Sequence, residues 1–428
     1  MARTKTLSAI DIGTCKMTTV IASQDEANGK LRAVGVANTP SKGLRKSQIV
    51  DIEEAVEALT QSVEAAERMA GCSLSSAFVS ISGAHIFSQN SSGVVAVANT
   101  EEEIVGEDVA RVIEAAKAIS LPSSREILHV IPRDFIVDGQ EGIKDPMGMT
   151  GVRLETEAHI ISGSATAMRN LAKCVTELGI DVSGLVFAGL AAADSVLTET
   201  EKELGVCLVD IGGGTTSLAV FVEGALSYSA VLPVGAKNIT NDIAIGLRVS
   251  LDSAEKIKIA LSTKDKEKLV KIREKSKKKD EIDLTKIGVM EEKSASYKTL
   301  TDGIILPRLN EIFAMIDEEL QKSGFAGATP AGVVLSGGGA RTVGIKDACK
   351  RSLSLPARVG EPKGLSGLTD EIITPEFAVT QGLVWYAAKN AGTEKRRLNL
   401  PQFGQFVSKI PVRGVAEKAI DFVKSFMP

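Results

Sequence analysis

Two segments far apart in this chain carry almost the same pattern. Residues 9–16 read AIDIGTCK, and residues 208–216 read LVDIGGGTT. In each segment an apolar run ends in an acid, glycine and threonine follow, and a second apolar, β-branched run begins. This pattern predicts a β-hairpin that turns on glycine, and it excludes the strand, glycine loop and helix of a P-loop. The repetition predicts two α/β halves, each opened by such a hairpin.

Length and composition exclude several classes of protein. A chain of 428 residues is too long for one core and fits two to four compact units. A net charge of −4 gives no electrostatic reason to expect nucleic-acid binding, so no nucleic-acid partner is predicted. The three histidines and five cysteines have no metal-ligand spacing, and no apolar run reaches the roughly 18 to 20 residues of a membrane-spanning helix. The first residues run directly into the first predicted strand, so no signal peptide is expected.

The first half is predicted to contain an inserted subdomain. Before it, hydrophobic periodicity predicts a helix over 52–69 and a strand over 77–82. Residues 84–159 then differ in character. They suggest a polar turn at 89–93, a helix that begins with a capping box at 100–103, and two strands at 126–130 and 134–137. This small α+β unit separates elements that would otherwise be neighbours, so we interpret it as an insertion.

Helices over 165–178 and 189–198, with a strand at 184–187 between them, lead into the second hairpin. A similar succession then begins again. Helical segments within 236–261, a long helix over 301–322 and a strand at 332–335 follow, and this strand ends in a third glycine turn at 336–341. The basic run at 264–279 is interpreted as a solvated loop.

Two facing hairpins of this kind suit a nucleotide's phosphates, because glycine lets backbone N–H groups approach phosphate oxygens closely. Glycines needed only for tight turns would not explain why an acid precedes both. Asp11 and Asp210 are predicted to bind Mg²⁺, largely through its waters. The second hairpin is expected to close on the terminal phosphate. The predicted phosphate-binding residues are Gly13, Thr14, Cys15, Lys16, Gly212, Gly213, Gly214, Thr215 and Thr216.

These hairpins and the turn at 336–341 resemble the phosphate and adenosine motifs of the actin, sugar kinase and heat-shock chaperone ATPases. Residues 254–262 resemble the chaperone helix that contacts adenosine. The resemblance implies ATP and Mg²⁺ as cofactors, and an α/β, actin-like, two-lobed ATPase fold with duplicated RNase H-like halves. Arg341 falls where the chaperones stack an arginine on adenine. The further nucleotide-binding residues that it implies are Glu255, Lys258, Ser262, Gly337, Gly338 and Gly339.

Within this superfamily the chain more closely resembles the FtsA family of bacterial cell-division proteins. The matching motifs lie at 41–44, 82–86, 129–132, 140–146, 187–190, 195–199 and 364–370, and so span almost the whole chain. The resemblance implies subdomain 1A at 1–83 and 160–204, the inserted subdomain 1C at 84–159, subdomain 2A at 205–237 and 302–389, and subdomain 2B at 238–301. It also implies a flexible linker at 390–411 and a membrane-targeting amphipathic helix at 412–428.

Residues 412–428 also have helical periodicity of their own. Burying each large apolar side chain in a lipid surface would contribute ~1.5 to 3 kcal/mol. The alternative is a helix docked on its own protein. The predicted membrane-facing residues are Val415, Ala419, Ile420, Phe422, Val423, Phe426 and Met427.

The family resemblance implies a filament-forming protein that tethers polymers of the tubulin-like FtsZ to the membrane. It implies self-assembly, recruitment of later division proteins through subdomain 1C, and a peripheral location on the cytoplasmic face of the membrane at the division septum. Arg308 and Glu311 match positions in the helix that faces the FtsZ tail. The alternative for these two residues is an ordinary exposed helix face.

A different class, an ATPase or kinase that acts on a soluble substrate, is the alternative function. Such an enzyme needs a carboxylate base that faces the terminal phosphate. The chaperones carry a glutamate at the start of the small-residue helix before the second hairpin, where this chain has Ala188. We therefore assign no catalytic residue and expect ATP to be bound tightly and hydrolysed slowly, acting mainly as a clamp between the halves.

Overall fold

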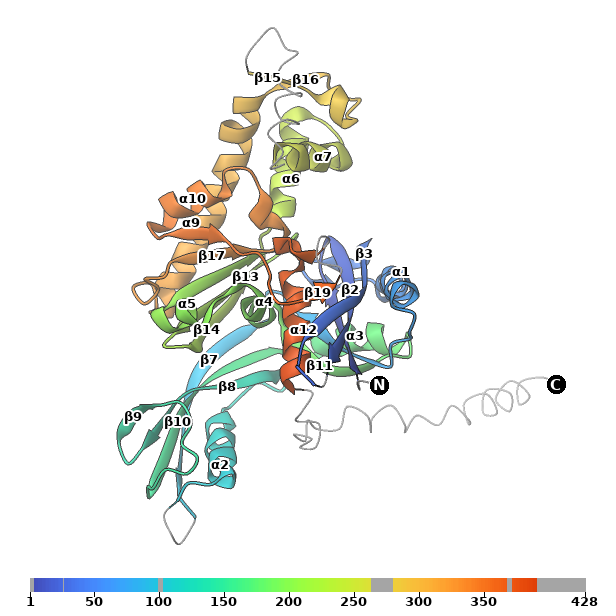
Figure 1. The fold of residues 1–428 in the computed structure, drawn as a ribbon. Coiled ribbons are helices and arrows are strands. Elements are labelled where there is room, and N and C mark those ends of the chain that lie inside the picture. The colour runs from blue at the N-terminus through green and yellow to red at the C-terminus, as the bar shows by residue number, and fades with distance from the viewer. Residues whose placement is uncertain (1–3, 26, 99–102, 263–279, 368–371, 391–428) are drawn as a thin grey trace, which may run out of the picture. The chain divides into compact units, whose positions relative to one another are not determined.

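The computed structural model describes residues 4–25, 27–98, 103–262, 280–367 and 372–390. The chain divides into one compact unit over Met1–Ala387 and a second over Ala388–Pro428, and the first holds almost all described residues (Figure 1). Several predicted features lie outside the described residues. They are the membrane helix at 412–428, the linker except for Asn390, the basic run at 264–279 and residues 100–102 of the capping box.

The first half is built on a six-stranded sheet of order β11-β6-β1-β2-β3-β19. β1, β2 and β3 form an antiparallel meander, and β6 and β11 extend it with parallel pairing. The predicted helix over 52–69 is confirmed as α1. Its N-terminus is capped by Asp51, which accepts a hydrogen bond from the Glu54 N–H, and its apolar face is buried against β2 and β3. The elements are β1 (Thr4–Ile12), β2 (Lys16–Asp25), β3 (Leu31–Pro40), β4 (Leu44–Arg45), β5 (Gln48–Ile49), α1 (Ile52–Ala70), β6 (Ser76–Ile81), α3 (Ala165–Thr176), β11 (Asp181–Phe187) and β19 (Ser366–Gly367).

The second half repeats this plan on a five-stranded sheet of order β14-β13-β12-β17-β18. β12 pairs with β13 in an antiparallel hairpin and with β17 in parallel, just as β1 pairs with β2 and β6. The predicted duplication and the actin-like α/β fold class are confirmed. The elements are α4 (Ala188–Val196), α5 (Glu199–Leu204), β12 (Val206–Ile211), β13 (Thr216–Val222), β14 (Ala225–Leu232), α6 (Ala236–Leu247), α7 (Leu251–Leu261), β15 (Glu281–Asp283), η1 (Leu284–Ile287), β16 (Ser294–Ser296), η2 (Thr299–Ile305), α9 (Leu306–Ser323), β17 (Val333–Ser336), η3 (Gly338–Arg341), α10 (Ile345–Leu353), β18 (Ala357–Val359), η4 (Pro375–Phe377) and α12 (Ala378–Asn390).

The predicted long helix over 301–322 differs in its first turns. It begins as the π-helix η2 and becomes the α-helix α9 at Leu306. Pro307 explains the change, because it has no N–H to donate and its ring obstructs regular α-helical bonding to the preceding turn.

The inserted subdomain is confirmed as an α+β unit, with a four-stranded sheet of order β7-β10-β8-β9. Helix α2 packs on this sheet through Val112 and Ala116, which are fully buried (Figure 1). The elements are β7 (Phe87–Ala96), α2 (Gly106–Lys117), β8 (Arg125–Val137), β9 (Gln140–Ile143) and β10 (Arg153–Ser164).

Three details predicted for this subdomain are wrong. Its helix begins at Gly106, and Glu103, the last residue of the predicted capping box, forms an isolated β-bridge. The predicted polar turn at 89–93 is the middle of strand β7. The two strands at 126–130 and 134–137 form the single strand β8, in which the pairing with β10 skips Arg133. A β-bulge therefore takes the place of the expected break.

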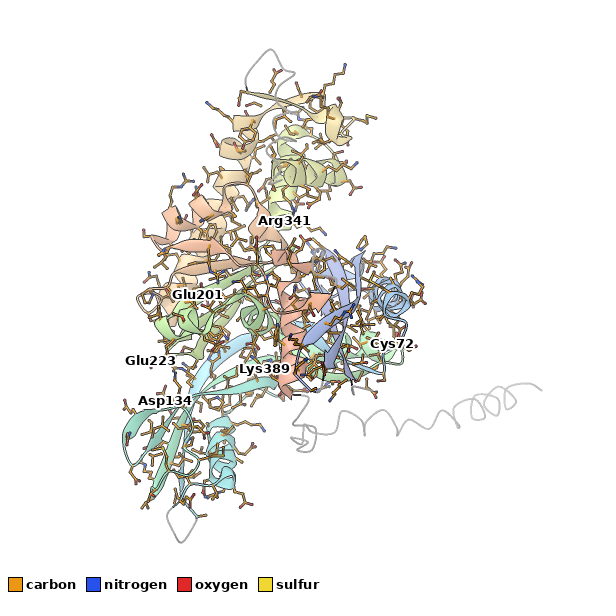
Figure 2. The ribbon with its side chains drawn as sticks, viewed as in Figure 1. Cys72, Asp134, Glu201, Glu223, Arg341 and Lys389 are labelled. Atoms are coloured by element: carbon orange, nitrogen blue, oxygen red, sulfur yellow. The ribbon has the colours of Figure 1, made fainter. Side chains whose placement is uncertain are left out.

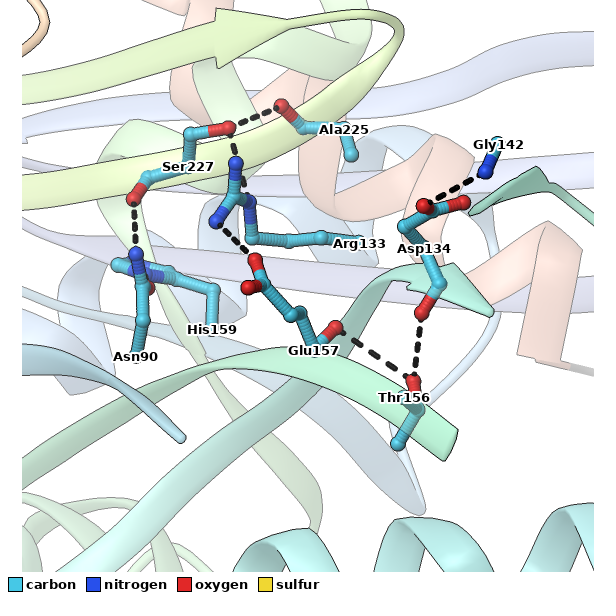
Figure 3. A network of polar contacts seen from close by, with 9 residues as sticks. All are labelled: Asn90, Arg133, Asp134, Gly142, Thr156, Glu157, His159, Ala225 and Ser227. Carbon is cyan, nitrogen blue, oxygen red and sulfur yellow. Dashed lines mark hydrogen bonds and ion pairs between the residues drawn. The ribbon is translucent and has the colours of Figure 1, made fainter. Parts of the chain in front are cut away.

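The polar residues of β7 have partners across the boundary between the subdomain and the second half. Ser88 Oγ donates to the Ser229 carbonyl oxygen at 2.7 Å, and Asn90 Nδ2 donates to the Ser227 carbonyl oxygen at 3.3 Å. The bulge directs Arg133 toward the same strand β14, where its Nε donates to Ser227 Oγ at 3.1 Å (Figure 3). We call these contacts, together with those of His159, the polar seam.

His159 lies at the centre of the polar seam and is 1% exposed. Its Nδ1 lies 2.7 Å from Asn90 Oδ1, and its Nε2 lies 3.0 Å from Ser229 Oγ. Because an amide oxygen only accepts, Nδ1 carries the proton and Nε2 accepts from the serine hydroxyl. The ring is neutral and both of its nitrogens are satisfied.

Two buried histidines should each make the protein less stable in mild acid. Burial lowers the pKa of His129 to about 4 and that of His159 to about 3, below the unfolded value near 6.5. Since the unfolded state then binds the proton more tightly, stability is lost as pH falls below 6.5. Between pH 6.5 and 5, each histidine should lower the free energy of unfolding by up to about 1.4 kcal/mol per pH unit.

Denaturant unfolding of the full chain at several pH values measures this slope. His159→Gln removes one of these titrating groups and should change the slope by up to about 1.4 kcal/mol per pH unit, whatever its effect on stability at pH 8. A slope unchanged in the variant contradicts the assignment.

Candidate functional site

Both predicted glycine hairpins are present, and their turns are closed in the same way. The Gly13 N–H donates to the Lys16 carbonyl oxygen at 3.0 Å, and the Gly212 N–H donates to the Thr215 carbonyl oxygen at 2.8 Å. A Cβ on Gly13 would lie 2.9 Å from that lysine oxygen, which is too close for any other residue without a shift. The sequence pattern is thus explained by the geometry of the turn.

The two turns meet face to face. A Cβ on Gly213 would lie 2.2 Å from Cys15 Sγ, and one on Gly214 would lie 2.8 Å from Thr14 Oγ1. Thr14 and Thr215 are both buried. The structure therefore brings together the residues that the sequence assigned to the phosphates, although they come from opposite halves of the chain.

The third glycine turn packs against the end of β12. Gly337 has a φ of 79°, and a Cβ there would lie 2.7 Å from Asp210 Oδ1. A Cβ on Gly339 would lie 2.4 Å from the Ile211 side chain. Asp210 thus stands between the second hairpin and the third turn.

Asp11, Asp210 and Lys16 lie in this site, and their charged groups make few hydrogen bonds. Ser80 Oγ donates to Asp11 Oδ1 at 2.5 Å, and this is the one side-chain hydrogen bond found for Asp11 or Asp210 in the described residues. Asp210 Oδ1 is buried without a hydrogen-bond partner, and so is Lys16 Nζ, which lies 4.1 Å from the centre of the Phe377 ring. Buried polar atoms are normally paired, so these orphaned atoms mark a place where a ligand's charges fit.

The pKa values of these groups reflect the same burial. Burial, and then the charge of Asp11, raises the pKa of Asp210 to about 7, against a smaller opposing effect of Lys16. Burial raises the pKa of Asp11 and lowers that of Lys16. A cation beside the carboxylates and an anion beside the lysine would each favour the charged form. No cluster of three or more histidine, cysteine or acidic residues suited to a metal occurs in the described ranges. Mg²⁺ held mainly by its own waters does not require such a cluster.

Of the predicted adenosine residues, Glu255 and Lys258 lie on α7 and Ser262 directly follows it. Lys258 Nζ contacts Glu255 Oε2 at 2.7 Å and Thr240 Oγ1 at 2.8 Å, while Ser262 Oγ donates to a carbonyl oxygen of its own helix. Helix α6 connects this group to the second glycine turn, because the N–H groups of Ala236 and Lys237 donate to carbonyl oxygens of that turn.

Arg341 is half exposed and pairs with Glu376 at 3.1 Å (Figure 2). Its partner and Phe377 belong to η4, which no sequence motif indicated. Ser80 was also missed, since a single serine at a strand end gives no signal until the fold places it beside Asp11.

Arg308 and Glu311, the predicted contacts for the FtsZ tail, form an ion pair with each other. Arg308 also makes a bidentate contact with Asp242 on α6, with distances of 2.6 and 2.9 Å. These bonds raise the pKa of the arginine. The two residues are thus held in place by contacts within the chain, and their role toward a partner stays a prediction.

Comparison with known proteins decides the family. A family model described as the SHS2 domain inserted in FtsA matches residues 83–162, and one described as cell division protein FtsA matches 207–382. The cell division protein FtsA of Pseudomonas aeruginosa is 39% identical, with 89% of each chain covered. The chain belongs to the FtsA family. The Bacillus subtilis FtsA is 38% identical over 94% of this chain and 88% of its own.

Solved structures support the actin-like fold of this FtsA-family protein. A PilM-PilN type IV pilus biogenesis complex matches with a TM-score of 0.62 at 17% identity, over 89% of this chain and 98% of that one. MreB 5 of Spiroplasma citri bound to AMPPNP matches with a TM-score of 0.53 at 14% identity, over 92% and 99%. The resemblance to a cell-division, actin-like protein is confirmed, while the predicted subdomain boundaries and individual site residues stay predictions. No helix within the described ranges is long and apolar enough to cross a membrane.

Replacing Asp210 should stabilise the ligand-free protein. Its raised pKa means that the folded state binds the proton more tightly, so the charged carboxylate costs stability as pH rises from about 4 to about 7. Asp210→Asn removes this cost, which for a shift of about three pKa units is at most on the order of 4 kcal/mol at pH 8.

Thermal unfolding at pH 5 and pH 8 tests this expectation. The melting temperature of Asp210→Asn should exceed that of the original chain, and the difference should be larger at pH 8 than at pH 5. Asp181→Asn, which changes an exposed acid at the start of β11, is the matched control and should show no such trend. If this difference in melting temperature is absent, or is the same at both pH values, the charged Asp210 carboxylate does not lower the stability of the protein.

Proposed function

We propose that this FtsA-family protein binds Mg²⁺ and ATP between the two glycine hairpins and uses the nucleotide as a clamp that favours a polymerising conformation. The observation that carries the proposal is the pair of orphaned, oppositely charged atoms, Lys16 Nζ and Asp210 Oδ1, buried beside the turns. The MreB relative in fold, which was solved with AMPPNP, supports it.

Each group has a distinct role in this proposal. Backbone N–H groups of the glycine turns and the Lys16 ammonium bind phosphate oxygens, and Asp11 and Asp210 hold the waters of Mg²⁺. Glu255, Lys258, Ser262 and Arg341 contact adenosine. ATP that contacts both halves at once stabilises the conformation in which the two hairpins face each other, because a ligand favours the state with which it makes more contacts.

Slow hydrolysis is part of the proposal. Ala188 stands at the start of α4 and is 5% exposed, and its methyl group offers no base for an attacking water. We therefore propose a cytoskeletal role and at most a weak ATPase activity.

The cellular role follows from the family and from the sequence of the C-terminus. We propose that residues 412–428 anchor the protein to the cytoplasmic face of the membrane, that the body binds FtsZ polymers and further copies of itself at the division septum, and that subdomain 1C recruits later division proteins. Family membership and the amphipathic pattern of the tail support this role.

Alkylation of Cys15 by iodoacetamide tests nucleotide binding directly. The side chain is exposed and lies at the meeting point of the hairpins, so bound ATP should cover it. Mg²⁺ and ATP at ten times the dissociation constant should slow its alkylation about tenfold. Cys72, an exposed thiol just after the end of α1, is the internal control and should react at the same rate throughout (Figure 2). If Mg²⁺ and ATP leave the alkylation rate of Cys15 unchanged, the proposed nucleotide site is wrong.

Assembly on lipid tests the cytoskeletal role. With ATP, the full chain should sediment with liposomes and form filaments on lipid monolayers in electron microscopy. A chain that ends at Asn390 should bind nucleotide normally but neither sediment nor form surface filaments. Equal sedimentation of the two chains would reject the tail as the anchor, and absence of filaments from both would reject polymerisation.

A further inference from the structure

The turn between β4 and β5 meets the two glycine hairpins, and it belongs to none of the motifs assigned to the nucleotide. It joins β4 to β5 through Lys46 and Ser47, whose φ angles are 50° and 59°. Two-residue hairpin turns with both φ values positive strongly favour asparagine and glycine. Here neither position has them, so the surroundings must hold the turn in this conformation.

Ser47 supplies the contacts that hold it. Its N–H donates to Thr14 Oγ1 at 2.8 Å, and its Oγ lies 3.2 Å from the same threonine oxygen. Its Oγ also lies 2.9 Å from Thr215 Oγ1. One serine hydroxyl therefore bridges the threonine of the first phosphate turn and the threonine of the second.

The bridge crosses from one half of the chain to the other. The β4–β5 hairpin is fixed to the first half, since the Gly43 carbonyl oxygen accepts from the N–H groups of Val50 and Asp51 and the Ser41 N–H donates to the Cys15 carbonyl oxygen. Thr215 belongs to the second half. A Cβ on Gly214 would lie 3.2 Å from the Lys46 Cα, so the β4–β5 turn touches the second half directly.

We propose that Ser47 is a further binding residue for the terminal phosphate of a nucleoside triphosphate. The inference rests on the proposed function, in which the second hairpin closes on that phosphate. A hydroxyl proton shared among neutral threonine oxygens can turn to a phosphate oxygen, where the charge makes the hydrogen bond roughly twice as strong. Ser47 thus exchanges its bond to Thr215 for one to the terminal phosphate, and a diphosphate leaves the original bond in place.

Two substitutions separate the hydroxyl from the strain of the turn. Ser47→Ala removes the hydroxyl and keeps a side chain at positive φ, whereas Ser47→Gly removes the hydroxyl and relieves the backbone. The glycine variant should unfold at the same temperature as the original chain or higher, so a binding defect in it cannot be attributed to poor folding. Gln48→Ala, an exposed neighbour on the same hairpin, is the matched control.

Calorimetric titration of the full chain with Mg²⁺ and ATP, and separately with Mg²⁺ and ADP, gives the decisive readout. Both Ser47 variants should bind ATP about tenfold more weakly, as expected for loss of a hydrogen bond to a charged group. Their ADP affinity should change less than about twofold, and Gln48→Ala should change neither.

Equal weakening of ATP and ADP, or no weakening of either, overturns the role of Ser47 while leaving the nucleotide site intact. An original chain that binds neither nucleotide overturns the proposed function and this inference together. Nucleotide binding by the original chain therefore distinguishes failure of the Ser47 role from failure of the proposed function.

Discussion

Two acidic strand ends, one from each half and both brought to the same place, are the constraint on which this architecture depends. Asp11 and Asp210 lie at the ends of β1 and β12, and the charge of one raises the pKa of the other. Carboxylates in such a position are costly unless a cation joins them. The glycine turns next to them admit a ligand, and the duplicated sheets position both turns. The two carboxylates destabilise the ligand-free protein at the place where a nucleotide and its metal ion would offset the destabilisation.

Much of the fold was predictable because it follows from local periodicity. The helix α1, the two hairpins and the inserted subdomain all have patterns that depend on their own residues. The errors lie where polar residues are not at the surface. Asn90 and its neighbours suggested a turn, but they form a strand that pairs with β10, and their side chains find partners on β14, which no local pattern can indicate. Two strands were predicted at 126–130 and 134–137, but the bulge at Arg133 keeps them in the single strand β8.

The candidate site divides in the same way. Residues in glycine motifs were found because the tight turns restrict the sequence, and the structure brings Thr14 and Thr215 together as expected. Ser80, Ser47 and Phe377 were not found, since each reaches the site through tertiary packing and none belongs to a spacing pattern. Motifs thus identified the backbone that would hold the phosphates, while the side chains that complete the site required the fold.

The polar seam has a consequence for how this molecule can move. The inserted subdomain is covalently part of the first half, yet Ser88, Asn90 and His159 bond it to β14 of the second. Directional bonds of this kind resist sliding far more than apolar contacts do, because a small displacement breaks several at once. The subdomain is also bonded to the first half, because the Phe187 N–H on β11 donates to His129 Nε2 on β8 at 3.0 Å and Arg169 on α3 pairs with Glu126 on β8 at 2.8 Å. The subdomain therefore cross-links the two halves, and any movement of one half away from the other must break its bonds on at least one side.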